Sequence, residues 1–266
     1  AASRLSRAII SGADTTLVFY VTGDLMLVDI IIERGKSSHG GCLLVYSDGT
    51  FYARAHIVES LLRRCAATAG GGAAFVHGSR TSMVLEGSVA EGNSAPHGGA
   101  LFIENGALVS IVSSSTTTMT RLVSNTATSY GGGVYLRGVG STFTATGTHV
   151  TVESNTAGQA GGGMILFSGA DVLVESGAAL VVQNNTATSL YGGGVCLESD
   201  GSTFTATGNS TRVTVESNSA GQRGGGMYLL SGADVLVESG AALSVQDNTA
   251  TSEDGGGVCL VFEGST

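Results

Sequence analysis

Glycine pairs and triplets recur along this chain at nearly equal intervals, and this regularity limits the possible folds more than any other feature. The distances between the last glycines of successive motifs are 31, 27, 34, 30, 31, 32 and 31 residues. A period of about 20–50 residues is typical of solenoids, propellers and other repeat arrays, in which each repeat packs on its neighbours. The motifs end at Gly41, Gly72, Gly99, Gly133, Gly163, Gly194, Gly226 and Gly257.

Each period contains short segments with strand character and no helical pattern. After the triplet that ends at Gly133, residues 134–136, 141–146 and 149–154 are rich in Val, Thr and Leu, and glycine-containing turns separate them. A propeller blade would need four antiparallel strands over about 40 residues, and a leucine-rich repeat would show a leucine frame that this chain lacks. We therefore predict an all-β fold, a parallel β-helix (solenoid) with three strands per coil and about eight coils of about 31 residues.

Coils of two types alternate along the chain. Residues 154–175 and 217–238 differ at only four of 22 positions, which gives a larger period of 61–63 residues. We predict a single β-helix domain over 1–266, with irregular N-terminal coils in 1–69 and regular coils in 70–266. Solenoids need terminal caps, and the sequence shows neither a capping helix nor a signal peptide. We therefore expect either that the chain is part of a longer protein or that rods stack end to end.

An asparagine follows the third strand segment in most coils. When coils stack in register, such amides can form a ladder of hydrogen bonds that fixes the turn. The predicted ladder consists of Asn93, Asn125, Asn155, Asn185, Asn218 and Asn248.

The asparagine elements also carry a family resemblance. An apolar residue precedes the asparagine by three positions, as in Leu122 to Asn125 and Val152 to Asn155, and GG with Ala, Val or Met follows. These elements resemble the FxxN and GGAI repeats of chlamydial polymorphic outer-membrane proteins and, more broadly, the right-handed β-helix repeats of the pectate-lyase-like superfamily. The resemblance covers about residues 70–260, with Val or Leu in place of Phe and GGG in place of GGA. It implies a right-handed parallel β-helix but no single activity, since that fold hosts lyases, adhesins and inert scaffolds.

One wall of the predicted solenoid is apolar on both surfaces. Residues one and three positions after the last glycine of each motif are uniformly apolar and are predicted to face the interior. Residues two and four positions after it should face outward, yet most of them are apolar too. Because such a sheet is normally covered on both faces, we expect either a flanking segment of the same protein or a neighbouring subunit to cover this wall. The predicted interface is Leu43, Leu101, Tyr135, Ile165, Phe167, Cys196, Tyr228, Leu230 and Cys259.

The four cysteines allow three pairings if all are oxidised. Cys196 and Cys259 occupy the same outer column two coils apart, about 9.6 Å, which exceeds the ~7 Å limit between α-carbons of a disulfide. They are interpreted either as cross-links between molecules or as two free thiols. Cys42 falls in an interior column and is predicted to be an inert buried thiol, and Cys65 replaces a ladder asparagine.

Several classes of chemistry find no support in the sequence. The five histidines show no zinc-like spacing, and no nucleotide, calcium or nucleophile motif occurs, so we predict no metal, no cofactor and no catalytic residue. A glycosidase pair of Asp171 and Glu175 would span about 13 Å, more than the ~5–9.5 Å that hydrolysis requires. With a net charge of −9 and no basic cluster beyond two adjacent arginines, nucleic acid is not an expected partner. No apolar run reaches the ~20 residues of a membrane span. Two sequons make Asn184 and Asn209 candidate N-glycosylation sites.

These observations predict a non-catalytic extracellular or cell-surface protein. The leading hypothesis is a subunit of a filament or appendage, similar to a flagellar hair or sheath, that assembles with itself or related β-helix subunits through the apolar wall and the rod ends. The alternative is an adhesin or autotransporter-type passenger, with glycans as possible partners. A polysaccharide-active enzyme is the weaker alternative.

Overall fold

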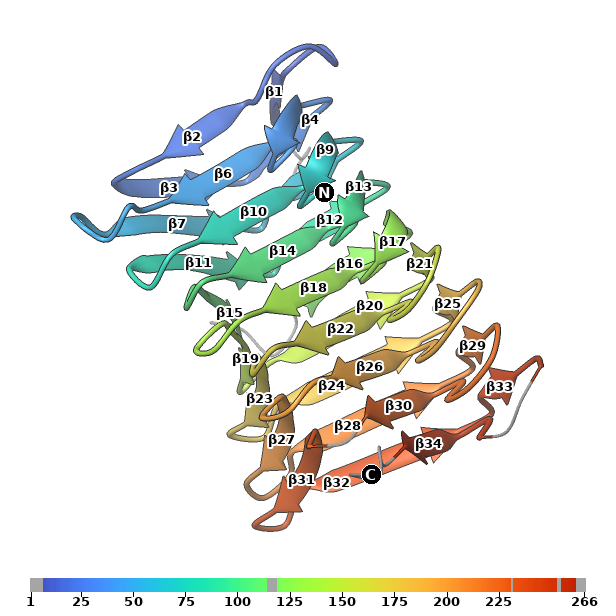
Figure 1. Cartoon of the computed structure of the whole chain (residues 1–266). Coiled ribbons are helices and arrows are strands. Elements are labelled where there is room, and N and C mark those ends of the chain that lie inside the picture. The colour runs from blue at the N-terminus through green and yellow to red at the C-terminus, as the bar shows by residue number, and fades with distance from the viewer. Residues whose placement is uncertain (1–6, 114–118, 231, 253–254, 262–266) are drawn as a thin grey trace, which may run out of the picture.

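The computed structural model describes residues 7–113, 119–230, 232–252 and 255–261 of the chain, and it is an all-β parallel solenoid (Figure 1). Two nine-stranded and two eight-stranded sheets run along the molecule, and every coil contributes one strand to each sheet it passes. All strand pairs between neighbouring coils are parallel, as in Val134–Arg137 beside Met164–Phe167. The predicted fold class, with about eight turns of roughly 30 residues, is confirmed.

The first sheet follows the glycine motif of each coil and forms the front of the view in Figure 1. It consists of β2 (Phe19–Val21), β6 (Leu43–Tyr46), β10 (Ala74–His77), β14 (Leu101–Glu104), β18 (Val134–Arg137), β22 (Met164–Phe167), β26 (Val195–Glu198), β30 (Met227–Leu230) and β34 (Val258–Val261). The second sheet follows it and consists of β3 (Asp24–Val28), β7 (Ala53–Val58), β11 (Thr81–Glu86), β15 (Leu108–Val112), β19 (Thr142–Thr146), β23 (Asp171–Glu175), β27 (Thr203–Thr207) and β31 (Asp234–Glu238).

The third sheet consists of β1 (Ala8–Ser11), β4 (Ile30–Glu33), β8 (Leu61–Arg63), β12 (Val89–Glu91), β16 (Met119–Val123), β20 (His149–Glu153), β24 (Ala179–Gln183), β28 (Arg212–Glu216) and β32 (Ala242–Gln246). The fourth sheet consists of β5 (Lys36–His39), β9 (Ala66–Gly70), β13 (Ser94–His97), β17 (Thr126–Tyr130), β21 (Thr156–Ala157), β25 (Thr186–Ala187), β29 (Ser219–Ala220) and β33 (Thr249–Ala250). The coil thus has a fourth strand beyond the three that the sequence predicts. From β21 onward it is only two residues long, too short to give a recognisable alternating pattern.

One hydrophobic core fills the solenoid. Alternate residues of the first three sheets point inward, and Phe143 and Phe204 of the second sheet are among the largest side chains that are fully buried. The same alternation leaves Thr142, Thr144 and Thr146 partly exposed on the outer face of that sheet. This burial is the main favourable contribution to folding, because apolar area removed from water contributes roughly 25 cal/mol per Å².

Each position of the triplet restricts the side chain for a different structural reason, as Gly131–Gly133 show. Gly131 has φ +65°, a left-handed conformation that side chains disfavour. A Cβ on Gly132 would overlap the carbonyl oxygen of Gly162 in the next coil. A Cβ on Gly133 would lie 2.7 Å from the carbonyl oxygen of Gly163 and 3.2 Å from Nδ2 of Asn155, so this third position tolerates at most a small residue.

The residue at this third position of the glycine motif explains why the predicted inward and outward faces were wrong in some coils. Ala73 pairs with Ala100, and Ala100 pairs with Gly133, the third glycine of the next coil, so both alanines occupy the third glycine position. Counting from the last glycine therefore shifts the assignment by one residue in the coils that follow Gly41, Gly72 and Gly99. Leu43 and Leu101, predicted to face outward, are 0% exposed and belong to the interior core. In those coils Leu44, Phe75 and Phe102 face outward instead.

The six asparagines named from the sequence form a continuous ladder that is buried except at Asn248, which is partly exposed. The side-chain amide of each donates to Oδ1 of the next asparagine at 2.9–3.0 Å, from Asn93 through Asn248. Asn155 also donates to the Leu122 carbonyl at 3.0 Å, and its Oδ1 accepts the backbone N–H of Asn125 at 2.9 Å. Every polar atom of a central asparagine is therefore satisfied within the protein, as burial requires.

The prediction that Cys42 is an inert thiol is wrong, because Cys42 and Cys65 form a disulfide with their α-carbons 5.4 Å apart. Cys65 occupies the ladder position of its coil, where its backbone N–H donates to Oδ1 of Asn93 at 2.9 Å. Cys42 occupies the third glycine position, which in later coils faces a ladder asparagine, as at Gly133, Gly163, Gly194 and Gly226. The disulfide thus replaces the contact that an asparagine and a small residue make elsewhere.

Candidate binding surface along the first sheet

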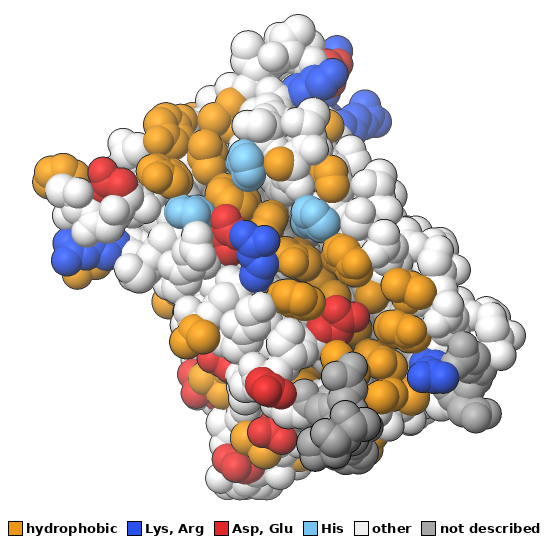
Figure 2. All heavy atoms as spheres, viewed as in Figure 1, with side chains coloured by type: hydrophobic (Ala, Val, Ile, Leu, Met, Phe, Trp, Pro, Cys, Tyr) orange, Lys and Arg blue, Asp and Glu red, His pale blue; other side chains and the backbone are white. Residues whose placement is uncertain are grey.

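The tyrosines of this chain gather on one side of the solenoid. Of the seven, Tyr20, Tyr46, Tyr135 and Tyr228 lie on the outer face of the first sheet. Tyr130 and Tyr191 lie along the fourth sheet at the same corner, and Tyr52 lies in the β6–β7 connection. Figure 2 shows hydrophobic side chains gathered along this face, with histidines among them. We call this surface the aromatic corner: Tyr20, His39, Leu44, Tyr46, Phe75, His77, His97, Phe102, Tyr130, Tyr135, Ile165, Tyr191, Cys196 and Tyr228.

The glycine motif creates the corner. It turns the chain between the fourth strand of one coil and the first strand of the next, so the residue before the glycines packs against the outer face of the first sheet. His97 stacks on Tyr130 with ring centroids 5.7 Å apart, and it lies 5.3 Å from the ring of Tyr135. Phe102 meets Tyr135 edge to face at 4.7 Å, a favourable arrangement for aromatic pairs.

This packing corrects the expectation that only another segment or subunit can cover the apolar wall. Tyr135 and Tyr228 are only 7% and 4% exposed, and Ile165 is 0% exposed, within this chain alone. Tyr191 covers the C-terminal part by stacking on Tyr228, with centroids 4.4 Å apart. Burial raises the pKa of Tyr228 to about 12. Much of the wall is therefore covered by residues that precede the glycines of the same molecule.

The remaining members of the predicted interface lie at the C-terminal half of the corner. Phe167, Leu230 and Cys259 are half-buried, and the first two stand in the outward column that also contains Glu104. Whether they contact a partner stays a prediction.

Cys196 cannot serve as the predicted intermolecular cross-link, because it is a free cysteine that is 0% exposed. Its Sγ donates to Oε1 of Glu198 at 3.7 Å. Burial raises the pKa of the Cys196 thiol well above its ordinary value and raises the pKa of the Glu198 carboxyl as well. Both groups are thereby held toward their neutral forms, and the thiol is poorly suited to disulfide exchange. Cys259 is also a free cysteine and is half-buried.

A charged network lies at the N-terminal half of the corner. Glu104, only 7% exposed, receives a 3.0 Å contact from Nδ1 of His77 and a 2.6 Å ion pair from Arg137. The Tyr46 ring stacks on the His77 ring at 5.1 Å. Arg137 also lies over the Phe102 ring at 5.8 Å. The network fixes the orientation of both the imidazole and the carboxylate.

A cleft of about 300 Å³ opens beside this network. Its lining is Tyr20, His39, Leu44, Tyr46, Phe75, His77 and Glu104. Tyr20 is 60% exposed at the rim, and its ring centroid lies 6.4 Å from that of Tyr46. A second hollow of about 140 Å³ shares Tyr20 and Tyr46 and is completed by Thr22, Ser47, Asp48 and Phe51. The two hollows give this end of the corner a continuous ring-lined surface.

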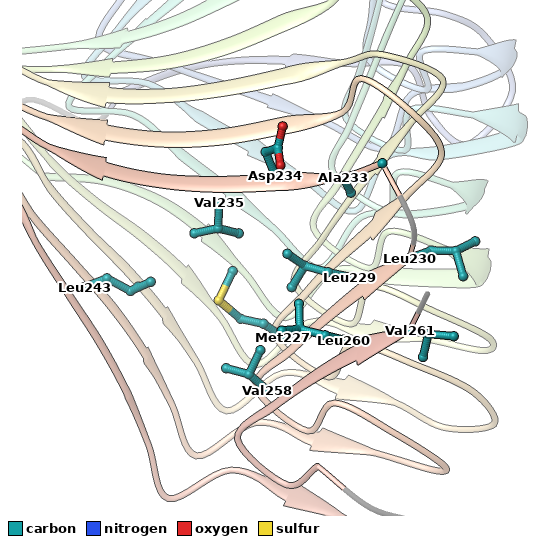
Figure 3. A pocket seen from close by; sticks show the side chains of 11 residues that line it. Met227, Leu229, Leu230, Ala233, Asp234, Val235, Leu243, Val258, Leu260 and Val261 are labelled. Atoms are coloured by element: carbon teal, nitrogen blue, oxygen red, sulfur yellow. The ribbon is translucent and has the colours of Figure 1, made fainter. Parts of the chain in front are cut away.

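Another hollow of about 390 Å³ lies at the opposite end of the molecule (Figure 3). Met227, Leu229, Val235 and Leu243 point into it, and all four belong to the interior columns or pack against them. It is therefore the end of the core rather than a surface site.

Acidic side chains and other potential metal ligands are dispersed among the described residues. Within those ranges no group of three or more His, Cys, Asp or Glu side chains could hold a metal ion. Glu104 and Glu198 stand in one outward column three coils apart, which places them about 14 Å from each other, too far for a glycosidase pair. Asp171 and Glu175, considered from the sequence, bond to threonines of neighbouring coils instead.

Both sequon asparagines, Asn184 and Asn209, are exposed. Asn184 has φ +55° in the turn after β24, directly before the buried Asn185. Thr211, the third residue of the other sequon, is 0% exposed, and its hydroxyl donates to the Thr207 carbonyl at 2.8 Å.

Sequence reasoning missed Tyr130, Tyr191 and His97 as parts of the surface. The inward and outward faces were assigned only for residues that follow each glycine motif, whereas these three residues come directly before it. Their recurrence before the motif, with His39 at the same position of an earlier coil, was the available signal.

Within the described residues no helix is long and apolar enough to cross a bilayer. Comparison with protein-family models, with curated proteins and with solved structures gives no match. The parallel β-solenoid itself is shown, while the finer resemblance to the chlamydial and pectate-lyase-like repeats stays a prediction.

Proposed function

We propose that this chain is a non-catalytic recognition segment of an extracellular or cell-surface protein, an adhesin-type solenoid that binds its ligand along the aromatic corner. The observation that carries the proposal is the gathering of six of the seven tyrosines, three histidines and an ion pair between the buried Glu104 and the half-exposed Arg137 on one side of the solenoid. Tyrosine suits recognition because its large amphipathic ring loses little conformational entropy on binding.

The Cys42–Cys65 disulfide supports the extracellular part of the proposal, since disulfides persist in oxidising compartments and are rare in the cytosol. The separation of Glu104 from Glu198 supports a binding role over hydrolysis. The repeat resemblance to chlamydial outer-membrane proteins fits an adhesin-type passenger in the same way.

A filament subunit is the second candidate. It is favoured by Phe167 and Leu230, which stay half-buried on the outer face where lateral packing could cover them. Sedimentation velocity would test it: reversible association that a Phe167→Ser, Leu230→Ser double variant abolishes would support a filament, and a monomer at high concentration would contradict it.

The recognition proposal is tested with the oxidised chain on immobilised extracellular polysaccharides, matrix proteins and whole cells. We expect saturable binding that a Tyr20→Ala, Tyr46→Ala double variant loses, with no product released. Thr205→Ala, on the outer face of the second sheet, is the matched control and should bind normally. Binding that survives the double variant, or release of cleaved product, would overturn the proposal.

A further inference from the structure

The cleft beside Glu104 combines two kinds of surface. Leu44 and Phe75 contribute apolar surface, and the rings of Tyr20, His39 and Tyr46 line it as well. The polar groups are concentrated at one end, where Nδ1 of His77 lies 3.0 Å from Oε1 of Glu104. Asn105, just outside the lining, places its Nδ2 3.4 Å from the same imidazole nitrogen. Small-ligand sites usually combine an apolar lining with a few fixed polar groups in this way.

The charges of the cleft cancel. Glu104 is already engaged by Arg137 at 2.6 Å and by His77 at 3.0 Å. An anionic ligand would meet the carboxylate, and a cationic ligand would compete with Arg137 for it. Displacing Arg137, whose own side chain is half exposed, is costly because it takes the partner away from the largely buried Glu104 carboxylate. The arrangement therefore favours a neutral ligand with several hydrogen-bonding groups.

We propose that this cleft binds a neutral pyranose unit of an extracellular glycan, an inference that rests on the proposed recognition function. A pyranose has an apolar C–H face that packs on aromatic rings, and hydroxyl groups at its edge that can bond to Glu104, His77 and Asn105. The volume of about 300 Å³ is at the lower end of the ~300–1,000 Å³ of small-ligand sites and suits one sugar ring.

The lining of the cleft comes from successive coils, so its rings follow one another along the solenoid axis. Tyr20, Tyr46 and His77 belong to three successive coils, β2, β6 and β10, whose strands are spaced by about 4.8 Å. Tyr46 is held against His77, so its ring needs little further ordering when the ligand binds.

The test is calorimetric titration of the oxidised chain with neutral β-linked hexose oligosaccharides and, as separate arms, with polygalacturonate, chitosan oligomers and a proline-rich peptide. We expect binding of at least one neutral oligosaccharide, weakened at least tenfold by Tyr46→Ala and by His77→Ala. Tyr52→Ala removes an exposed tyrosine outside the cleft lining and should bind as the unmodified chain does. Circular dichroism of each variant verifies that it is folded.

The outcomes separate the two proposals. If the chain binds surfaces through the corner but no neutral oligosaccharide, or if Tyr46→Ala and His77→Ala bind normally, the glycan inference fails and the recognition function stands. Equal or tighter binding of polygalacturonate, chitosan or the peptide through Tyr46 also overturns the neutral-sugar assignment. Absence of binding to every surface and every ligand overturns both.

Discussion

The asparagine ladder gives the most quantitative prediction. Asn155 is 0% exposed, and its side chain makes four hydrogen bonds of 2.9–3.0 Å to Asn125, Leu122 and Asn185. Replacing it with alanine leaves the backbone N–H of Asn125 and one of its amide protons without their acceptor. Oδ1 of Asn185 loses the side-chain amide donor of Asn155 but still accepts the backbone N–H of residue 155.

The magnitude follows from the two orphaned donors. Each buried unsatisfied polar group costs about 1–3 kcal/mol, so Asn155→Ala should lower the free energy of unfolding by about 4 kcal/mol. Asn248→Ala should cost less, because Asn248 ends the described ladder and is partly exposed. Asn209→Ala is the surface control, expected within about 0.5 kcal/mol of the unmodified chain.

The assay is urea denaturation followed by far-UV circular dichroism, since the chain has no tryptophan to report on unfolding. A loss at Asn155 that differs from the loss at Asn209 by less than about 1 kcal/mol would refute the view that the ladder stabilises the coils.

Three other perturbations test separate features. Reducing the disulfide that joins Cys42 and Cys65, 23 residues apart, should cost about 3 kcal/mol in the chain-entropy account, and an unchanged urea midpoint under reductant would contradict this. Gly132→Ala should destabilise by more than about 3 kcal/mol because its Cβ would meet three backbone atoms at 2.3–2.7 Å. Gly133→Ala should be milder, since its Cβ would meet one backbone oxygen at 2.7 Å and alanine occupies that position naturally in two coils; equal losses in melting experiments would count against the triplet argument. Burial and a neighbouring arginine lower the pKa of His97, so below its ordinary value of 6.5 the unfolded chain takes up a proton that the folded chain refuses. Stability should therefore fall as the pH drops from about 6.5 through the lowered pKa, and His97→Gln should remove that slope in a pH series of urea titrations.

The fold could be predicted because its signals repeat. Eight glycine motifs and six asparagines each indicate the same coil of about 31 residues, so an error in one coil did not change the predicted solenoid. The register of single coils was less secure. A motif written GGA or GGC ends one glycine early, and for this reason Leu43 and Leu101 were assigned to the wrong face.

The disulfide could have been found from the same comparison. Where the ladder asparagine is replaced by Cys65, the small residue that faces it is replaced by Cys42. Aligning the third glycines, rather than the last ones, brings these two exceptions into one coil.

The self-covered wall could not be predicted in the same way. An outward apolar residue such as Ile165 does not show in the sequence whether its cover comes from another molecule or from the turn beside it. That depends on the sharp angle at Gly131, which places Tyr130 over the first sheet, and this angle is a tertiary property.

The side-chain amides of the ladder all point the same way, with each oxygen toward the N-terminal coils and each NH₂ toward the C-terminal coils. Every interior asparagine of the ladder therefore offers an acceptor to the preceding asparagine and a donor to the following one, whatever its position in the ladder. Gene duplication could add or remove a two-coil unit without leaving a mismatched junction. The near-identity of 154–175 and 217–238 is what such growth by copying would leave behind.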